Sequence, residues 1–476
     1  MLEKTYRVLF FAFLVWAPIP IGSNRAVFWS INAVIVLGIF LLLVIDEWRN
    51  RRSRTAVQRT VVLLLALTTV PLVWMVVQAL SLTPSALHSP TWADLSVADL
   101  SWSGAISVNP GATLSAASNF VTVALAGIIA ARIAMSSRQT LILLNVVIAS
   151  AALVAAWGIA ARYMGWSQVI LGSSDGTTVL TSFFVNRNTT ATYLSLGLVA
   201  SLALVMGRLE QSRSPNFIAA IADFPRRVGP YLLVMALIGL ALLQTGSRAG
   251  IAAGGLGTIA VLILGFRRAA AESHWVVALL FVGGGILVLL FGVSAEGIID
   301  RLTETGAVDA TRWQLYADTL AAIVDRPILG FGAGTFYDFF PGYHSEALGI
   351  SSGIWLEAHN TYLQSAAELG LPMFLFALGA LLFLVGRFSI IAFRREDPMP
   401  GAVAGLGAAV VVGFHALFDF SLQIQSVAII FAVLIGTGVA GPVRAQLRRR
   451  PQLPTERVAR RYETFSVAPR SPTQPV

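Results

Sequence analysis

The chain has 476 residues, of which 56% are hydrophobic and 12% are charged. A soluble globular protein carries about 25% charged residues, so water-soluble folds are excluded and most of the chain is expected to lie in lipid. The net charge of +9 would suggest a nucleic-acid partner in a soluble protein, but these basic residues stand in short segments beside apolar runs. Membrane orientation explains such a pattern, so no nucleic-acid partner is expected.

Two further classes of chemistry are excluded by absent residues or motifs. Cysteine is absent, which rules out disulfides, thiolate metal sites and cysteine nucleophiles. No Gly-rich phosphate loop of the Walker type occurs, so ATP hydrolysis is not expected.

Apolar runs recur along nearly the whole chain. A bilayer core of about 30 Å needs about 20 apolar residues in a helix. The first run follows Lys4 and Arg7 and lacks a clear cleavage site, so we interpret it as an uncleaved first helix. Breaks in hydropathy predict an all-α protein with twelve spans, near residues 8–23, 27–46, 60–80, 112–131, 139–160, 189–207, 230–247, 249–266, 275–293, 362–385, 401–420 and 423–441.

The segments between these spans alternate sharply in basic content. If both termini are cytoplasmic, 26 of the 33 Lys and Arg residues lie on the inner side and seven on the outer side. The positive-inside rule therefore predicts this orientation. The seven outer cations are Arg25, Arg162, Arg187, Arg248, Arg301, Arg312 and Arg326.

The chain is expected to have two parts. Residues 1–442 form the transmembrane domain, with a large outer loop at about 294–361 before the tenth span. Residues 443–476 are basic and then Pro/Ser-rich, which is typical of a lipid-surface contact followed by disorder on the cytoplasmic side. Two other outer segments, 81–111 and 162–188, are also long enough to carry chemistry.

Arg187 lies in TSFFVNRNTTATYL, between Asn186 and Asn188, where a span begins. Helix N-capping by Asn188 or Thr189 explains the polar cluster without a ligand. It does not explain Arg187, because a cation at the positive end of a helix is unfavourable unless an anion is close. The pattern predicts a negatively charged ligand.

Arg248 stands in a tight turn between two apolar runs, in LLQTGSRAGIAAGG. Its small neighbours would let a bulky anion approach the guanidinium and the free N–H groups of the next helix. Snorkelling of the side chain to the interface is the alternative that needs no ligand.

A surface helix is predicted from Ala310 to the break before Pro327. Its apolar face is formed by residues three and four apart, Trp313, Tyr316, Leu320 and Ile323. Arg312 lies at its start and is expected near the same outer surface as Arg187 and Arg248. The glycines of the following GFGAGTF form a turn, for which packing is favoured over phosphate binding.

The outer histidines that could act as bases are His344, His359 and His415. His359 and Asn360 come just before the tenth predicted span, and Tyr362 follows one turn later. A cap or interface role is the alternative for His359. His415 and Asp419 are four residues apart on one predicted helical face, where we favour a structural pair over a catalytic one.

In chain order, NRN, TGSRAG, RWQLY, RPILGFGAGTF and AHNTYLQSAAELGLP resemble the O-antigen ligase and polymerase superfamily. The resemblance covers about residues 180–420. His359-Asn360 followed by Gly370 is similar to the His-Asn signature of ligases, and Met373 stands where ligases usually have a small or polar residue.

The resemblance implies a glycosyltransferase of the bacterial inner membrane that uses an undecaprenyl-diphosphate-linked glycan on the periplasmic side, without a metal or other cofactor. It implies that His359 is the general base for the acceptor hydroxyl. Arg248 is the second catalytic candidate, and with Arg187 and Arg312 it would bind the diphosphate leaving group. The remaining substrate-binding candidates are Asn186, Asn188, Asn360 and Tyr362.

The sequence does not identify the acceptor of the glycan. Lipid A core as acceptor would make the protein a ligase, which the His-Asn signature slightly favours, whereas a second lipid-linked glycan would make it a polymerase of O-antigen or exopolysaccharide. Direct displacement of the diphosphate by the acceptor would invert the configuration at the anomeric carbon. A transporter of solutes or lipid-linked sugars is the alternative class, but transporters place ionisable groups near the bilayer midplane.

Overall fold

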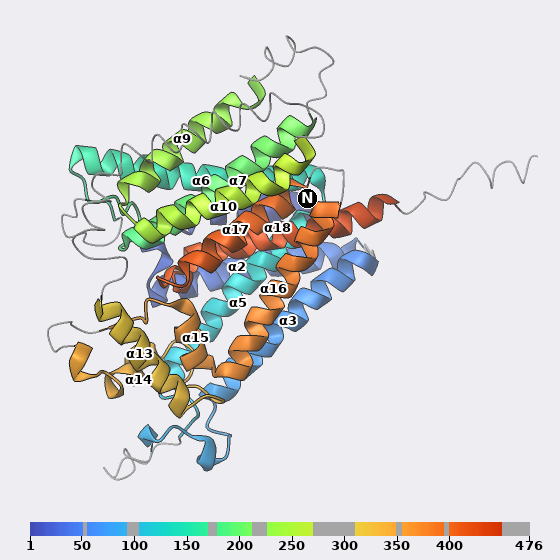
Figure 1. Cartoon of the computed structure of the whole chain (residues 1–476). Helices are drawn as coiled ribbons and strands as arrows, with labels where there is room; N and C mark the ends of the chain where they lie inside the picture. The colour runs from blue at the N-terminus through green and yellow to red at the C-terminus, as the bar shows by residue number, and fades with distance from the viewer. Residues whose placement is uncertain are drawn as a thin grey trace, which may run out of the picture.

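The computed structural model describes residues 1–50, 55–92, 104–169, 179–211, 226–269, 310–348, 355–394 and 399–449. These residues form helices and short 3-10 turns without a β-strand (Figure 1). Among them, six helices are long and apolar enough to cross a membrane, and shorter apolar helices accompany them. The described chain is therefore a polytopic helical membrane protein, as the hydropathy pattern predicts.

The long candidate spans are α2 (Ala26–Arg49), α3 (Thr55–Ala79), α5 (Pro110–Ile133), α6 (Ser137–Met164), α7 (Arg187–Gln211) and α16 (Leu371–Arg394). Shorter apolar stretches lie in α9 (Gly229–Gln244), α10 (Arg248–Ala269), α17 (Pro400–His415) and α18 (Gln425–Arg449). The chain starts with α1 (Leu2–Trp16) and the 3-10 turn η1 (Ile21–Ser23). The predicted span at 275–293 lies outside the described residues, as does most of the 443–476 tail.

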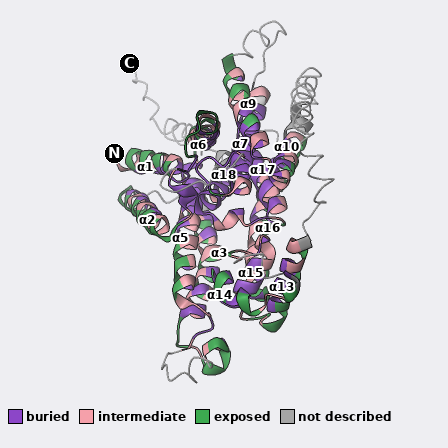
Figure 2. Ribbon diagram, turned by 90° about the vertical axis from the view of Figure 1, so that its left-hand side faces the viewer, coloured by how far each residue is buried: buried purple, intermediate pink, exposed green. Residues whose placement is uncertain are grey.

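Helix α7 is the centre of the bundle. Every residue from 189 to 207 is buried, and α7 contacts α6, α9, α10 and α17. Figure 2 shows buried residues concentrated around α7, α17 and α18. Small residues allow this close approach: a Cβ added at Gly197 would lie 2.2 Å from the Cβ of Ala151, and one at Gly250 would lie 2.3 Å from that of Ala191. The second contact fixes the first turn of α10 against the first turn of α7.

A smaller helical layer covers one end of the bundle, which we call the loop end. It contains α13 (Ala310–Asp325), α14 (Phe336–Phe339), α15 (Thr361–Leu369) and the 3-10 turns η2 (Ser85–Leu87), η3 (Phe340–Gly342) and η4 (Glu346–Leu348). It has its own apolar core, which includes Leu315, Phe331, Phe336 and Ala367. The predicted helix before Pro327 is confirmed as α13.

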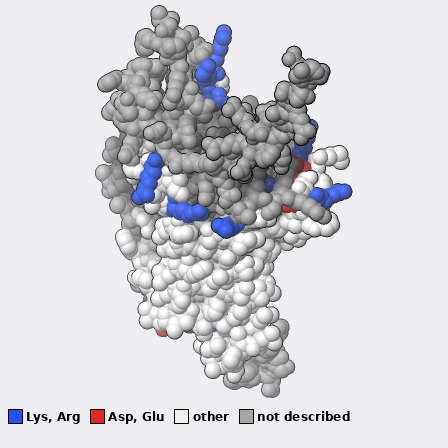
Figure 3. Space-filling model, turned by 90° about the vertical axis from the view of Figure 1, so that its right-hand side faces the viewer, with Lys and Arg blue, Asp and Glu red and all other residues white. Residues whose placement is uncertain are grey.

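Basic side chains gather away from the loop end. On the face shown in Figure 3, the visible Lys and Arg residues lie above the middle of the molecule, and the described surface below them is almost entirely uncharged. Arg49, Arg132, Arg208 and Arg394 stand in the last turns of α2, α5, α7 and α16. This separation of charge agrees with the asymmetry that the sequence predicts between the two sides.

The glycines of the GFGAGTF turn take part in packing. Gly330, Gly332 and Gly334 all have positive φ angles, which favour glycine. The backbone N of Gly332 donates to the carbonyl of Glu368 at 2.9 Å. A Cβ on Gly330 would lie 2.4 Å from the same carbonyl oxygen. The turn therefore packs directly on the end of α15, as favoured from the sequence.

Three of the predicted spans require correction. The span at 8–23 is wrong in its last part, because α1 ends at Trp16. The span at 362–385 is divided at Gly370, whose φ of +78° separates α15 from α16. The span at 401–420 is wrong in its last part, because α17 ends at His415. The carbonyl of Ala416 instead accepts a hydrogen bond from the backbone N of Thr361 at 2.9 Å. Asp419 therefore does not share a helical face with His415.

Gly370→Ala is expected to destabilise the protein. A Cβ there would lie 2.1 Å from the carbonyl oxygen of Ile328, and the backbone conformation is one that alanine rarely adopts, so a loss of about 2 kcal/mol or more is expected. Thermal unfolding in detergent measures it. Gly379→Ala is the matched control, because nothing lies within 4 Å of its Cβ position; equal melting temperatures for the two variants would contradict the prediction.

Candidate active site

The first turns of α7 and α10 meet at one corner of the loop end. Each helix begins at an arginine, α7 at Arg187 and α10 at Arg248, and both side chains are half-buried. Asn188 joins the two turns: its Oδ1 accepts from Ser247 Oγ at 2.7 Å. Its backbone N donates to Asn186 Oδ1 at 2.8 Å. Residues predicted from two separate motifs are thus brought together.

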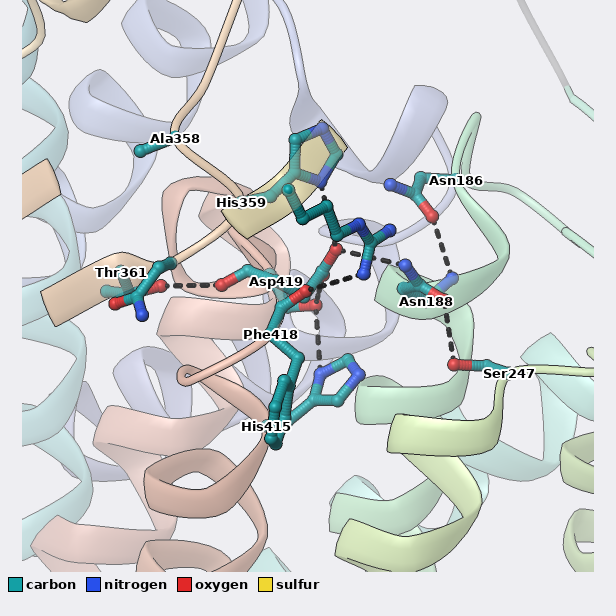
Figure 4. A network of polar contacts seen from close by, with 12 residues as sticks. Asn186, Asn188, Ser247, Ala358, His359, Thr361, His415, Phe418 and Asp419 are labelled. Carbon is teal, nitrogen blue, oxygen red and sulfur yellow. Dashed lines mark hydrogen bonds and ion pairs between the residues drawn. The ribbon is translucent and has the colours of Figure 1, made fainter. Parts of the chain in front are cut away.

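Asp419 lies at the centre of this corner and is completely buried. Its Oδ1 accepts from Asn188 Nδ2 at 3.1 Å (Figure 4). Its Oδ2 accepts from Ser421 Oγ. His359 Nδ1 lies 4.0 Å from Oδ1. Thr361 Oγ1 donates to the carbonyl oxygen of Asp419 at 3.0 Å. Sequence analysis paired Asp419 only with His415, whereas the structure makes it the link between α7, α15 and the segment after α17.

His359 is held in a strained conformation directly before α15. Its φ is +52°, which is uncommon for a residue other than glycine and is typical of functional sites. Its carbonyl oxygen accepts from the hydroxyl of Tyr316 at 3.1 Å. The imidazole lies edge-on to the rings of Trp355 and Phe420, with centroid distances of 5.6 and 4.9 Å. These contacts fix the orientation of the ring toward Asp419.

The charges around His359 favour its neutral form. Burial lowers the pKa of the imidazole below its usual 6.5, the positive charge of Arg312 lowers it further, and the carboxylate of Asp419 opposes both effects. Arg312 is half-buried at the start of α13, where its Nη1 donates to the carbonyl oxygen of Phe418 at 3.4 Å. Arg312 therefore lies beside the same corner, as predicted.

Asn360 and Tyr362 are engaged with the backbone. Asn360 caps α15, because its Oδ1 accepts from the backbone N of Tyr362 and of Leu363, both at 3.0 Å. Its Nδ2 donates to the carbonyl of Leu417 at 3.1 Å. The Tyr362 hydroxyl donates to the carbonyl of Gly413 at 2.7 Å. These bonds tie α15 to the end of α17 and position His359.

His415 and His344 lie apart from this arrangement. His415 is buried, and its Nδ1 pairs with Thr192 Oγ1 at 2.6 Å. It reaches Asp419 only through Ser421, whose Oγ is 3.4 Å from the same nitrogen. His344 is half-buried in the outer layer, where its ring lies 6.2 Å from that of Phe340. The geometry leaves His359 as the histidine that faces the corner.

A pair of carboxyl groups that sequence analysis missed lies next to His359. The side-chain amide of Gln364 donates to Glu357 Oε2 and to Glu368 Oε1, the latter at 3.0 Å. The backbone N of Ala358 donates to Gln364 Oε1 at 3.1 Å and so sets the orientation of this amide. Glu368 Oε2 accepts from the backbone N of Gly334 at 2.8 Å. The pair thereby connects the segment before His359 with the glycine turn.

Burial governs the protonation of this pair. It raises the pKa of Glu357 to about 8, with further contributions from Glu368 and Asp419. It raises the pKa of Glu368 to about 7, although the hydrogen bonds from Gly334 and Gln364 oppose the shift. No sequence pattern marked these residues, because both stand in ordinary polar positions beside the His-Asn signature.

A pocket of about 630 Å³ adjoins the corner. Its lining includes Arg187 and Asn186 from the start of α7, Phe420 beside the His359 ring, and Arg25 and Glu357. Among the residues that the structure describes, no group of three or more His, Cys, Asp or Glu side chains is placed to hold a metal ion.

The two raised pKa values predict that stability falls as the pH rises. The folded protein holds protons on Glu357 and Glu368 that the unfolded chain releases above about pH 4.5, so the free energy of unfolding decreases toward pH 7 to 8. The share of Glu368 is on the order of 3 kcal/mol.

Thermal unfolding in detergent at several pH values measures this dependence. Glu368→Gln should flatten it, because the amide does not titrate. Glu346→Gln is the control, since Glu346 is exposed in η4. A slope that Glu368→Gln leaves unchanged would overturn the assignment.

Comparison with known proteins finds a family model that matches part of the chain. Residues 233–378 match the family model described as O-Antigen ligase. Comparison with curated proteins gives no match. The matched segment contains Arg248, Arg312 and His359, whereas Arg187 and Asp419 lie outside it and join the corner through the fold. This match confirms the resemblance of the sequence motifs: residues 233–378 are similar to the O-antigen ligase family of membrane proteins.

Proposed function

We propose that the protein is a glycosyltransferase that moves a glycan from undecaprenyl diphosphate to an acceptor hydroxyl at the loop end, which faces the periplasm. The observation that carries this proposal is the meeting of the helix starts that bear Arg187 and Arg248 at Asn188. Asn188 donates to the buried Asp419, which His359 faces and beside which Arg312 lies. The separation of basic side chains from the loop end supports the orientation, with both termini in the cytoplasm.

The arginines suit the leaving group of this reaction. Breaking the bond between the anomeric carbon and the diphosphate oxygen leaves the electron pair on that oxygen, so negative charge develops on the diphosphate. Guanidinium groups bind phosphate oxygens in a planar, bidentate geometry. The positive ends of the α7 and α10 helix dipoles add positive potential at the same place. Charge stabilisation of this kind needs no bound metal ion.

His359 suits the role of general base. Its neutral form is favoured at neutral pH, so it can take the proton of the acceptor hydroxyl while the oxygen attacks the anomeric carbon. Nδ1 faces Asp419, which leaves Nε2 for the acceptor. The Asp419 carboxylate at 4.0 Å then stabilises the imidazolium. Direct attack of this kind inverts the configuration at the anomeric carbon.

The other candidates have supporting roles in this proposal. Asn186 and Asn188 stand beside Arg187, where they can contact the donor glycan, and Asn188 also orients Asp419. Asn360 and Tyr362 position His359 through their backbone contacts.

Arg248→Ala and His359→Ala are each expected to lower glycan transfer at least 100-fold, because each removes a group that acts in the transition state. Transfer is measured with a lipid-linked glycan in membranes, after membrane insertion has been checked. His344→Ala is the control, since His344 lies outside the corner. Full transfer by properly inserted Arg248→Ala and His359→Ala proteins would refute the mechanism.

The pH profile of kcat/KM offers a second test. Because burial and Arg312 lower the pKa of His359, the acid limb should have its midpoint below pH 6.5. Asp419→Asn removes the charge that raises this pKa, so it should move the limb to lower pH as well as slow the reaction. A limb that stays in place in Asp419→Asn would count against His359 as the base.

The acceptor decides between a ligase, which we favour on the His-Asn signature, and a polymerase. The glycan profile of a deletion strain separates them. Loss of all long chains from lipid A core indicates a ligase, whereas core that carries a single repeat indicates a polymerase.

A further inference from the structure

The 630 Å³ pocket beside His359 shares Arg187 with the proposed diphosphate site and is also lined by residues that the bond-breaking step does not use, among them Asn24 and Arg25. Its volume falls in the range of about 300–1,000 Å³ that is usual for small-molecule sites. Four parts of the chain form its walls: the turn before α2, the segment before α7, the residues before His359 and the segment between α17 and α18. Its polar lining includes Asn24, Arg25, Asn186, Arg187 and Glu357.

The walls of this pocket are strained. Four residues other than glycine have positive φ in the described part of the chain, namely Ile21, Ser23, Ser182 and His359, at +53°, +58°, +53° and +52°. Each of them lines the pocket or lies within two residues of one that does. Such conformations persist only where the surroundings enforce them, and they cluster at ligand sites. For a β-branched residue such as Ile21 the conformation is a clear outlier.

Hydrogen bonds hold the strained turn before α2 in place. Ser23 Oγ donates to the carbonyl of Ala17 at 2.6 Å and accepts from Asn32 Nδ2 at 2.9 Å. Ser426 Oγ donates to the carbonyl of Gly22 at 2.7 Å. A Cβ on Gly22 would lie 2.4 Å from the ring of Phe184, which also lines the pocket. This wall of the pocket is therefore held in place by contacts with the end of α1, with α2 and with α18.

The charge of the lining favours an anion. Arg25 is exposed at the start of α2, and its side chain makes no hydrogen bond or ion pair with another described residue. Arg187 is shared with the proposed diphosphate site. Glu357 is the carboxyl group in the described lining, and with its pKa at about 8 it is protonated at neutral pH. With Glu357 neutral, the described lining carries a net positive charge from Arg25 and Arg187.

The rest of the lining suits a sugar. Asn24, Asn186 and the protonated Glu357 can donate to and accept from hydroxyl groups. The ring of Phe420 offers an apolar face next to His359. In the proposed function the diphosphate is bound by Arg187, Arg248 and Arg312. An anion bound at Arg25 would therefore be a second negatively charged group on the same substrate.

We propose that this pocket binds an acidic sugar residue of the transferred glycan, with its carboxylate at Arg25 and its hydroxyls at Asn186 and Glu357. The proposal rests on the proposed function and names its substrate class as acidic glycans.

Binding to the purified, full-length protein in detergent tests the pocket without requiring transfer. The probes are sodium glucuronate, glucose and inorganic pyrophosphate at matched ionic strength, followed by isothermal titration. Glucuronate should bind and glucose should not. Arg25→Gln should weaken glucuronate at least tenfold and leave pyrophosphate unchanged. Arg162→Gln, at the exposed end of α6 and outside the pocket lining, should change neither.

Three outcomes would overturn the proposal: absence of glucuronate binding, equal binding of glucose, or an equal loss of pyrophosphate and glucuronate binding in Arg25→Gln. The last would mean that the diphosphate itself occupies the pocket. Glucuronate binding that depends on Arg25 in a protein without transfer activity would instead refute the proposed function and keep the pocket.

The pH dependence of glucuronate binding tests the role of Glu357. The charged groups around it are Glu368 behind Gln364, Asp419, and the two arginines of the lining. Above about pH 8 Glu357 ionises and should repel the carboxylate, so the affinity should fall. Glu357→Gln should bind glucuronate at pH 7 and lose this fall. A fall that persists in Glu357→Gln would refute the contact.

Discussion

The buried carboxylate of Asp419 is the constraint on which the arrangement of the loop end depends. A charge enclosed in a helical bundle is tolerated only where it is hydrogen-bonded or paired. Asn188 from α7 and Ser421 from the segment after α17 supply the hydrogen bonds, and His359 faces the same carboxylate from the start of α15. The hydrogen bonds and the charge contact of this one carboxylate therefore connect three segments that are distant in the sequence.

The rigidity of the bundle makes this corner suitable for catalysis. Helix α7 is enclosed on all sides, and small residues let α10 approach it closely enough that Arg187 and Arg248 begin their helices side by side. The outer layer holds His359 beside Asp419. Asn360 donates to the carbonyl of Leu417, and the Tyr316 hydroxyl donates to the carbonyl of His359. Groups held in this way need little reorganisation when charge develops in the transition state.

His359 and Glu357, which lie close together at the loop end, have opposite protonation states at neutral pH. Burial keeps His359 unprotonated and keeps Glu357 protonated at neutral pH, because in each case it disfavours the charged form. In the proposed reaction the histidine is thus ready to accept a proton, while the carboxyl group beside it does not repel an anionic substrate. Burial therefore sets the protonation state of both His359 and Glu357, and the arginines are the charged groups that contact the substrate in this proposal.

The sequence by itself determined the helical membrane class, the alternation of basic segments and the motifs that carry Arg187, Arg248, Arg312 and His359, because hydropathy, charge and spacing are local properties. Only the tertiary structure decided which of these residues meet and which polar groups are already occupied. Gly370 ends α15 with a positive φ at a place where a Cβ would clash with Ile328, and carbonyls after the end of α17 accept hydrogen bonds from the start of α15. Asp419, Glu357 and Arg25 acquire their environments from segments far away in the chain. Burial and pairing in three dimensions, which no local pattern records, gave these residues their places in the site.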